Sequence, residues 1–187
     1  TVIGTWLRTR GHRPHIATKA AFSTDPARRI DNRPEHLKGE LEGSLRRLGV
    51  DPVTLFYAHR HAPIVPAEDL AGTMQRLQEE GKILGYGLSE VGPYTLERCH
   101  AVQPVMAVQN EYSLWTRTPE LGLIQRCAQL GVAFVPFSPL ARGVFGTPMA
   151  DPARFAKDEF RSRIPRFHPE NWPHNQLKLQ AFHAFAE

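Results

Sequence analysis

The chain has 187 residues, 41% of them hydrophobic and 22% charged, which is typical of one globular domain with a substantial core. The formal net charge is +4, but the basic residues are scattered and no motif supports a nucleic-acid partner. No apolar run approaches the roughly 20 residues needed to cross a bilayer, and the first residues resemble no signal peptide. We therefore expect a soluble protein without a membrane segment.

The chain opens with TVIGTWLRTRG, which has no initiator Met and looks like the middle of a helix. We expect that the sequence is a piece of a longer protein. Cys99 and Cys127 fall within helical patterns and form no CxxC pair, so we expect reduced, buried thiols in a cytoplasmic protein.

The first predicted strand is HIATK at 15–19, and a helix follows it at 34–48. Four leucines recur at spacings of four, four and three in this helix, which makes one apolar stripe. Pro34 suits the first helical turn, and Gly49 suits the end of the helix.

The rest of the chain continues the alternation. A β-branched and aromatic strand at 53–59 precedes a helix at 66–82, which Pro66 opens and Gly81 ends. Further strands are predicted at 83–89, 105–110 and 132–139, and further helices at 93–101 and 118–131, the last of which Thr118 caps and Gly131 stops. Residues 140–173 form a long excursion rich in Pro, Gly and Arg, and a last helix begins near Asn175.

This rhythm predicts about five parallel β-α units with right-handed crossovers. An open doubly wound sheet and an eightfold barrel both fit the pattern. The absence of a GxGxxG motif after any strand counts against the open dinucleotide-binding sheet.

Each apolar strand ends in a polar group, and in a barrel such strand ends meet at one mouth, where the active site forms. The groups at the strand ends are Lys19, His59, Ser89 with Glu90, Gln109 with Asn110, and Ser138. We therefore predict a shared site at these positions.

Several motifs then give the chain a family resemblance: IATK, SLRRLGVDPVTLFYAHR, EEGKILGYGLSE, VQNEYSLW, VPFSPLARG and RSRIPRFHPEN. In this order they resemble the aldo-keto reductases, which are NADP-dependent (β/α)8 barrels of the TIM type. The resemblance covers residues 1–187 and implies an incomplete barrel domain with the 140–173 excursion. It spans the third to seventh strands, so the first two strands, the last strand and the family's catalytic Tyr and nearby Asp would lie outside this chain.

The resemblance implies two catalytic residues. Lys19 would lower the pKa of the catalytic Tyr, and His59 would hydrogen-bond the substrate carbonyl. Leu55, Tyr57 and His59 share one face of their strand because side chains alternate. Arg60 and His61 have no counterpart and are expected to shape the loop, with substrate contact as the alternative. His59 and His61 are only two of the ligands that a zinc site needs, so no metal is expected.

The resemblance also implies an NADPH site. Ser89, Gln109 and Asn110 would hold the nicotinamide carboxamide, and Phe137 would stack on the ring unless it is only core. The segment with Ser138, Leu140 and Arg142 would follow the diphosphate. Tyr112 and Trp115 would wall the substrate pocket or serve as buried anchors.

The predicted function is NADPH-dependent reduction of aldehydes and ketones by the parent enzyme. The 187-residue chain alone is expected to be nearly inactive and marginally stable, because five strands leave two sheet edges unpaired. A non-catalytic regulatory subunit of the potassium-channel β type and a decayed gene fragment are alternatives. A phosphate-binding barrel lyase is disfavoured because SPLARG is a poor phosphate loop. Substrate identity, NADP against NAD preference and oligomeric state stay open.

Overall fold

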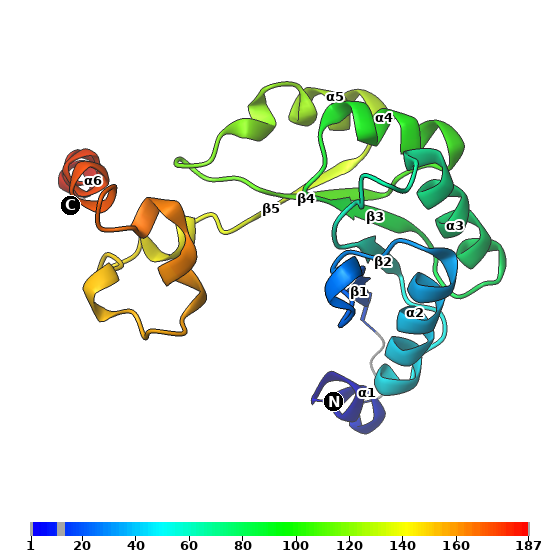
Figure 1. Ribbon diagram of the computed structural model, residues 1–187. Coiled ribbons are helices and arrows are strands. Elements are labelled where there is room, and N and C mark those ends of the chain that lie inside the picture. The colour runs from blue at the N-terminus through cyan, green and yellow to red at the C-terminus, as the bar shows by residue number, and fades with distance from the viewer. Residues whose placement is uncertain (1, 11–13, 187) are drawn as a thin grey trace. The chain divides into compact units, whose positions relative to one another are not determined.

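A computed structural model describes residues 2–10 and 14–186 of the chain, which divide into two compact units (Figure 1). The first unit contains the chain up to 111 together with 118–137, and the second contains 112–117 together with the residues from 138 onward. Each unit is described separately below.

The first unit is built on a five-stranded parallel sheet in which neighbours in sequence are neighbours in space, in the order β1-β2-β3-β4-β5. The strands are β1 (Ala17–Ala20), β2 (Leu55–Ala58), β3 (Tyr86–Ser89), β4 (Ala107–Glu111) and β5 (Ala133–Phe137). Each is shorter than the apolar run that predicts it, because only these residues form continuous ladder pairs. Among the described strands, β1 and β5 each pair on one side only.

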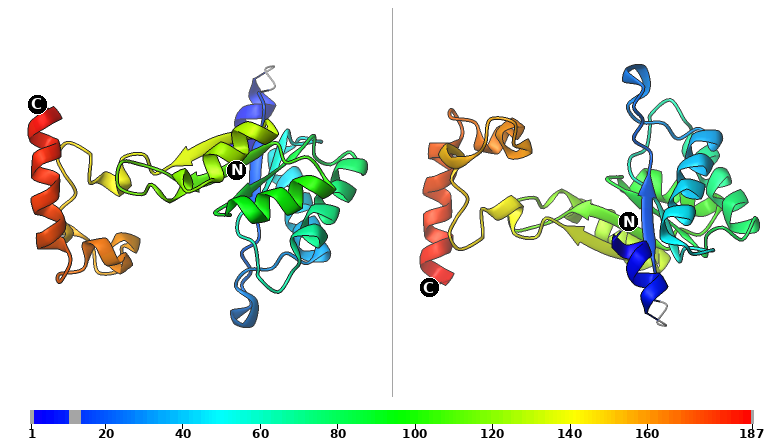
Figure 2. Two further views of the ribbon diagram at one scale, coloured as in Figure 1. Left: turned by 90° about the horizontal axis from the view of Figure 1, so that it is seen from above. Right: turned by 90° about the horizontal axis from the view of Figure 1, so that it is seen from below.

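The connecting helices are α2 (Pro34–Leu48), α3 (Ala67–Glu79), α4 (Pro93–Val102) and α5 (Leu123–Leu130), preceded by α1 (Val2–Thr9) beside α2. They form one layer on the outer side of the sheet, as Figures 1 and 2 show. Sequential strand order with right-handed crossovers puts all helices on one face, whereas a doubly wound sheet has helices on both. The predicted partial TIM-type barrel is therefore confirmed.

Helix α2 illustrates how the sequence specifies this layer. Pro34 occupies its first turn, and Gly49 ends it in the left-handed conformation, with φ 71°. Leu37 and Leu41 are fully buried against the outer face of the sheet, where Phe56 is also buried. This face carries the main hydrophobic core of the unit.

The single helix predicted at 118–131 is wrong. Thr118–Glu120 form a separate 3-10 turn, and α5 begins only at Leu123, so Thr118 does not cap it. Gly122 has φ 119°, a conformation that a continuous helix cannot contain.

The second unit consists of 3-10 turns and one long helix, α6 (Trp172–Ala186), which begins three residues before the predicted start. The turns are drawn in yellow and orange and α6 in red in Figure 2. A small core joins them, centred on buried Val144, Phe167 and Leu179. No helix in the described part of the chain is both long enough and apolar enough to cross a membrane.

Candidate active site at the carboxyl ends of the strands

The inner face of the sheet, opposite the helices, carries a row of aligned residues. Lys19 pairs in register with Tyr57, Tyr57 with Gly87, and Gly87 with Ala107. A Cβ on Gly87 would lie 2.5 Å from the Tyr57 ring, so glycine is what lets this ring lie across β3. The row thus forms a floor of one aromatic ring and small residues beneath the strand ends.

Lys19 extends over this floor. Its Nζ lies 5.0 Å from the centre of the Tyr57 ring and donates a hydrogen bond to Oε1 of Gln109, which lies on β4. Partial burial, followed by the positive charge of Arg60, lowers the pKa of Lys19, while Glu90 acts in the opposite direction. The side chain therefore joins β1 to β4 across the inner face.

His59 follows directly after β2, and its backbone N–H donates to the carbonyl of Ala20 at 2.8 Å. The Phe22 ring contacts the imidazole edge-on, with centroids 4.6 Å apart. Burial lowers the pKa of His59, and the charges of Lys19 and Arg60 lower it further. The imidazole is therefore neutral at neutral pH and retains one N–H donor.

Ser89 and Gln109 are register partners on β3 and β4, so they lie side by side one step beyond the floor. Ser89 is buried, and its hydroxyl accepts a hydrogen bond from Arg60 at 3.2 Å. Asn110 is the next residue and points to the other face, where its amide bonds the N–H and carbonyl of Val91. In this arrangement Asn110 fixes the turn after β3.

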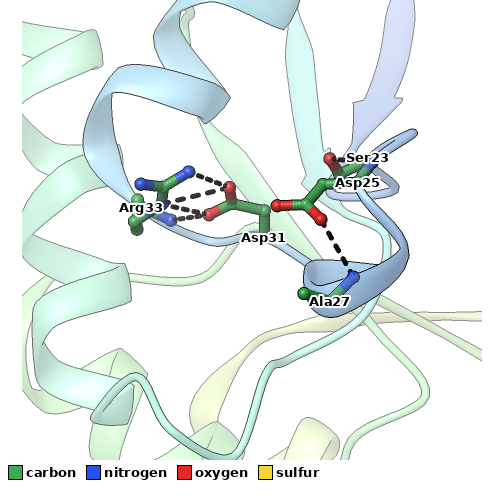
Figure 3. Close-up of polar contacts among 5 residues, drawn as sticks. All are labelled: Ser23, Asp25, Ala27, Asp31 and Arg33. Atoms are coloured by element: carbon green, nitrogen blue, oxygen red, sulfur yellow. Dashed lines mark hydrogen bonds and ion pairs between the residues drawn. The ribbon is translucent and has the colours of Figure 1, made fainter.

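The turn after β2 is held from outside by Asn32, which is 1% exposed. Its amide donates to the Arg60 carbonyl at 3.0 Å and accepts from the Ala62 N–H at 2.6 Å. Asp31, also buried, is bound through both carboxylate oxygens by the Arg33 guanidinium, and Figure 3 shows this pair beside the Asp25 turn. The 21–33 loop therefore supports the segment that carries His59 and Arg60.

The other predicted site residues divide between the units. Phe137 ends β5 in the first unit. Ser138, Leu140 and Arg142 belong to the second unit, where Ser138 and Arg142 have positive φ and the Arg142 guanidinium stacks on Phe160. Leu140 is exposed.

Tyr112 and Trp115 belong to the second unit as well. Trp115 packs against the small core, with the Arg166 guanidinium 5.6 Å from its ring centre. Trp115 is partly buried in this packing, and its role stays a prediction.

Sequence reasoning missed Phe22, Asn32 and the Arg60–Ser89 bond. Phe22 and Asn32 are on a loop without periodicity, so no pattern marks them. The position of Arg60 directly after His59 was the only available signal. Nε2–H of His61 donates to the Val65 carbonyl at 2.7 Å, a contact within the loop that His61 was expected to shape. Among the described residues, no group of three potential metal ligands gathers.

Comparison with known proteins agrees with this geometry. A profile described as the Aldo/keto reductase family matches residues 1–187. The aldo-keto reductase str7 of Strobilurus tenacellus is 39% identical over 175 residues, which are 92% of this chain and 52% of that protein.

Two solved structures give the same picture. The glycerol dehydrogenase AKR11B4 of Gluconobacter oxydans matches with a TM-score of 0.84 at 27% identity, over 99% of this chain and 58% of that one. The aldo-keto reductase AKR11C1 of Bacillus halodurans, in its holo form, matches with a TM-score of 0.66 at 26% identity, over 76% and 48% of the two chains. The chain thus spans somewhat more than half the length of str7 and AKR11B4. A profile match over its full length, a homologous reductase and a shared barrel topology together place this chain in the aldo/keto reductase family.

Proposed function

We propose that the whole protein containing this chain is an oxidoreductase that reduces aldehydes or ketones to alcohols with NADPH. The observation that carries the proposal is the grouping of Lys19, His59, Ser89 and Gln109 at the carboxyl ends of neighbouring strands. Partially buried cations and a neutral imidazole in one place are typical of a catalytic site. The two free, buried cysteines support a cytoplasmic location.

The polar groups of this site fit a nicotinamide carboxamide. With Oε1 of Gln109 bonded to Lys19, its Nε2 can still donate, and the Ser89 hydroxyl can donate while it accepts from Arg60. Asn110 has both amide groups engaged with Val91, so its proposed role is support of this region rather than direct contact. Phe137 would contribute a ring face, and, as the family resemblance implies, the segment with Ser138, Leu140 and Arg142 would follow the diphosphate, with Arg142 as the phosphate partner by charge.

NADPH supplies a hydride when bound, and the chain's residues prepare the acceptor. The neutral His59 donates its N–H to the carbonyl oxygen, which orients the carbonyl and stabilises charge that develops there. Lys19, as an ammonium, stabilises the anionic form of a nearby phenol and so favours proton transfer near neutral pH. The phenol expected from the family lies outside this chain.

The test is NADPH consumption by the whole protein with a panel of aldehydes and ketones. We expect His59→Ala to lower kcat by roughly 100- to 1,000-fold, the usual cost of one donor to a developing oxyanion. His15→Ala is the matched control, because His15 is an exposed histidine that precedes β1 at the opposite end of the strand. NADPH binding without turnover of any carbonyl compound would instead support a cofactor-binding regulatory subunit.

A further inference from the structure

In the reaction proposed above Arg60 contacts neither the carbonyl compound nor the cofactor, yet its guanidinium lies within the site. Nη1 donates to the carbonyl of His59 at 2.6 Å and to the hydroxyl of Ser89 at 3.2 Å. These two bonds use both hydrogens of Nη1 and fix the plane of the guanidinium between β2 and β3. The group is therefore oriented before any ligand arrives.

The opposite edge of the guanidinium, made by Nε and Nη2, keeps three N–H donors. Within residues 2–10 and 14–186, no hydrogen bond or ion pair engages this edge. Two parallel N–H groups on one edge match the two oxygens of a carboxylate. The geometry is thus that of an anion-binding fork whose other side is already anchored.

The charged groups around Arg60 also favour an anionic ligand. Lys19 and Arg60 are both cationic, and each lowers the pKa of His59. Glu90 is the acidic group whose charge acts on Lys19, and one of its carboxylate oxygens accepts from the Glu111 N–H at 2.6 Å. A partly buried cation without a carboxylate partner is costly, and an anionic ligand would remove that cost.

We propose that Arg60 binds a carboxylate of the substrate, so that the preferred substrates are aldehydes or ketones that also carry a carboxylate. This proposal rests on the proposed function. A cofactor phosphate has the same chemistry, but Arg60 is bonded to Ser89, the residue assigned to the uncharged carboxamide. An Arg60 guanidinium beside Ser89 and His59 would therefore bind an anionic group that belongs to the carbonyl compound.

The experiment compares two aldehydes of similar shape in the whole protein, 4-carboxybenzaldehyde and 4-methylbenzaldehyde. We expect the carboxylate to be preferred in kcat/KM. Arg60→Gln should raise KM for 4-carboxybenzaldehyde roughly 10- to 100-fold more than it raises KM for the neutral aldehyde, the value of a hydrogen bond to a charged group. Arg60→Lys should recover only part of the loss, because it restores the charge without the fork.

A second measurement separates this proposal from the proposed function. Calorimetric titration with 4-(hydroxymethyl)benzoate, with and without NADP, reports anion binding whether or not the protein turns over. Binding that Arg60→Gln abolishes, in a protein without reductase activity, would support the fork and contradict the reductase. Reductase activity without a preference for the carboxylate, an equal loss with both aldehydes, or a loss confined to NADPH affinity would overturn the role of Arg60.

Discussion

Replacement of Asp31 by Asn tests how firmly the 21–33 loop supports the site. The Asp31 carboxylate is 3% exposed and accepts from the backbone N–H and the guanidinium of Arg33, at distances from 2.7 to 3.1 Å. The Arg33 side-chain hydrogen bonds lower the pKa of Asp31 from 3.8 to about 2, against the opposing effect of burial. Asn keeps the shape and loses the charge.

A lowering of the Asp31 pKa from 3.8 to about 2 corresponds to on the order of 2 kcal/mol of stability. Arg33 is half exposed, so solvent screening reduces the expected loss to about 1–2 kcal/mol at neutral pH. Because the folded pKa is the lower one, the unfolded chain binds more protons between about pH 4 and 2. The stabilisation is therefore complete above pH 4, and roughly half of it is left at pH 3.

Denaturant unfolding of the wild type and Asp31→Asn at pH 7 and pH 3 measures this difference. Asp25→Asn is the control, because Asp25 lies on the same loop but is exposed and only caps the Ala27 N–H. A difference between the wild type and Asp31→Asn that stays constant from pH 7 to pH 3 would refute the electrostatic argument.

Three further predictions concern packing and reactivity. Gly87→Ala should destabilise the protein by about 1–3 kcal/mol in denaturant unfolding, because the new methyl group would lie 2.5 Å from the Tyr57 ring. The control is Gly39→Ala on α2, which has open space around it and should be neutral or stabilising in the same assay. Leu41→Ala should cost about 2–5 kcal/mol, because the side chain is fully buried, and a loss below 1 kcal/mol would contradict its place in the core. Burial raises the pKa of Cys99 to about 12, so an aromatic disulfide reagent should modify it only as fast as the protein unfolds, and rapid native-state labelling would count against this.

The β-α units could be predicted because the sequence carries two kinds of signal, apolar periodicity and residues that fix the ends of elements. Helix α2 has both a leucine stripe and residues that fix its two ends, and its predicted bounds agree with the structure. The predicted helix at 118–131 rested on a cap at Thr118 and a stop at Gly131; Gly131 does end α5, but the conformation of Gly122 separates Thr118 from that helix. Local backbone conformation at a glycine is not visible in a pattern of apolar residues.

The candidate site was predictable only to the extent that parallel strands bring their ends together. Lys19, Ser89 and Gln109 follow from strand ends. Asn32 and Phe22 reach the site from a loop whose course depends on long-range contacts such as the hydrogen bond from Asn32 to the Arg60 carbonyl. Such contacts leave no period in the sequence.

The hydrogen bond from Lys19 to Gln109 has a consequence for the order of events in the site. It makes the ammonium and the amide a single unit, so a ligand that turns the Gln109 amide also takes away a partner of Lys19. A ligand that arrived at β4 would in this way change the contacts of a side chain on β1, across two intervening strands.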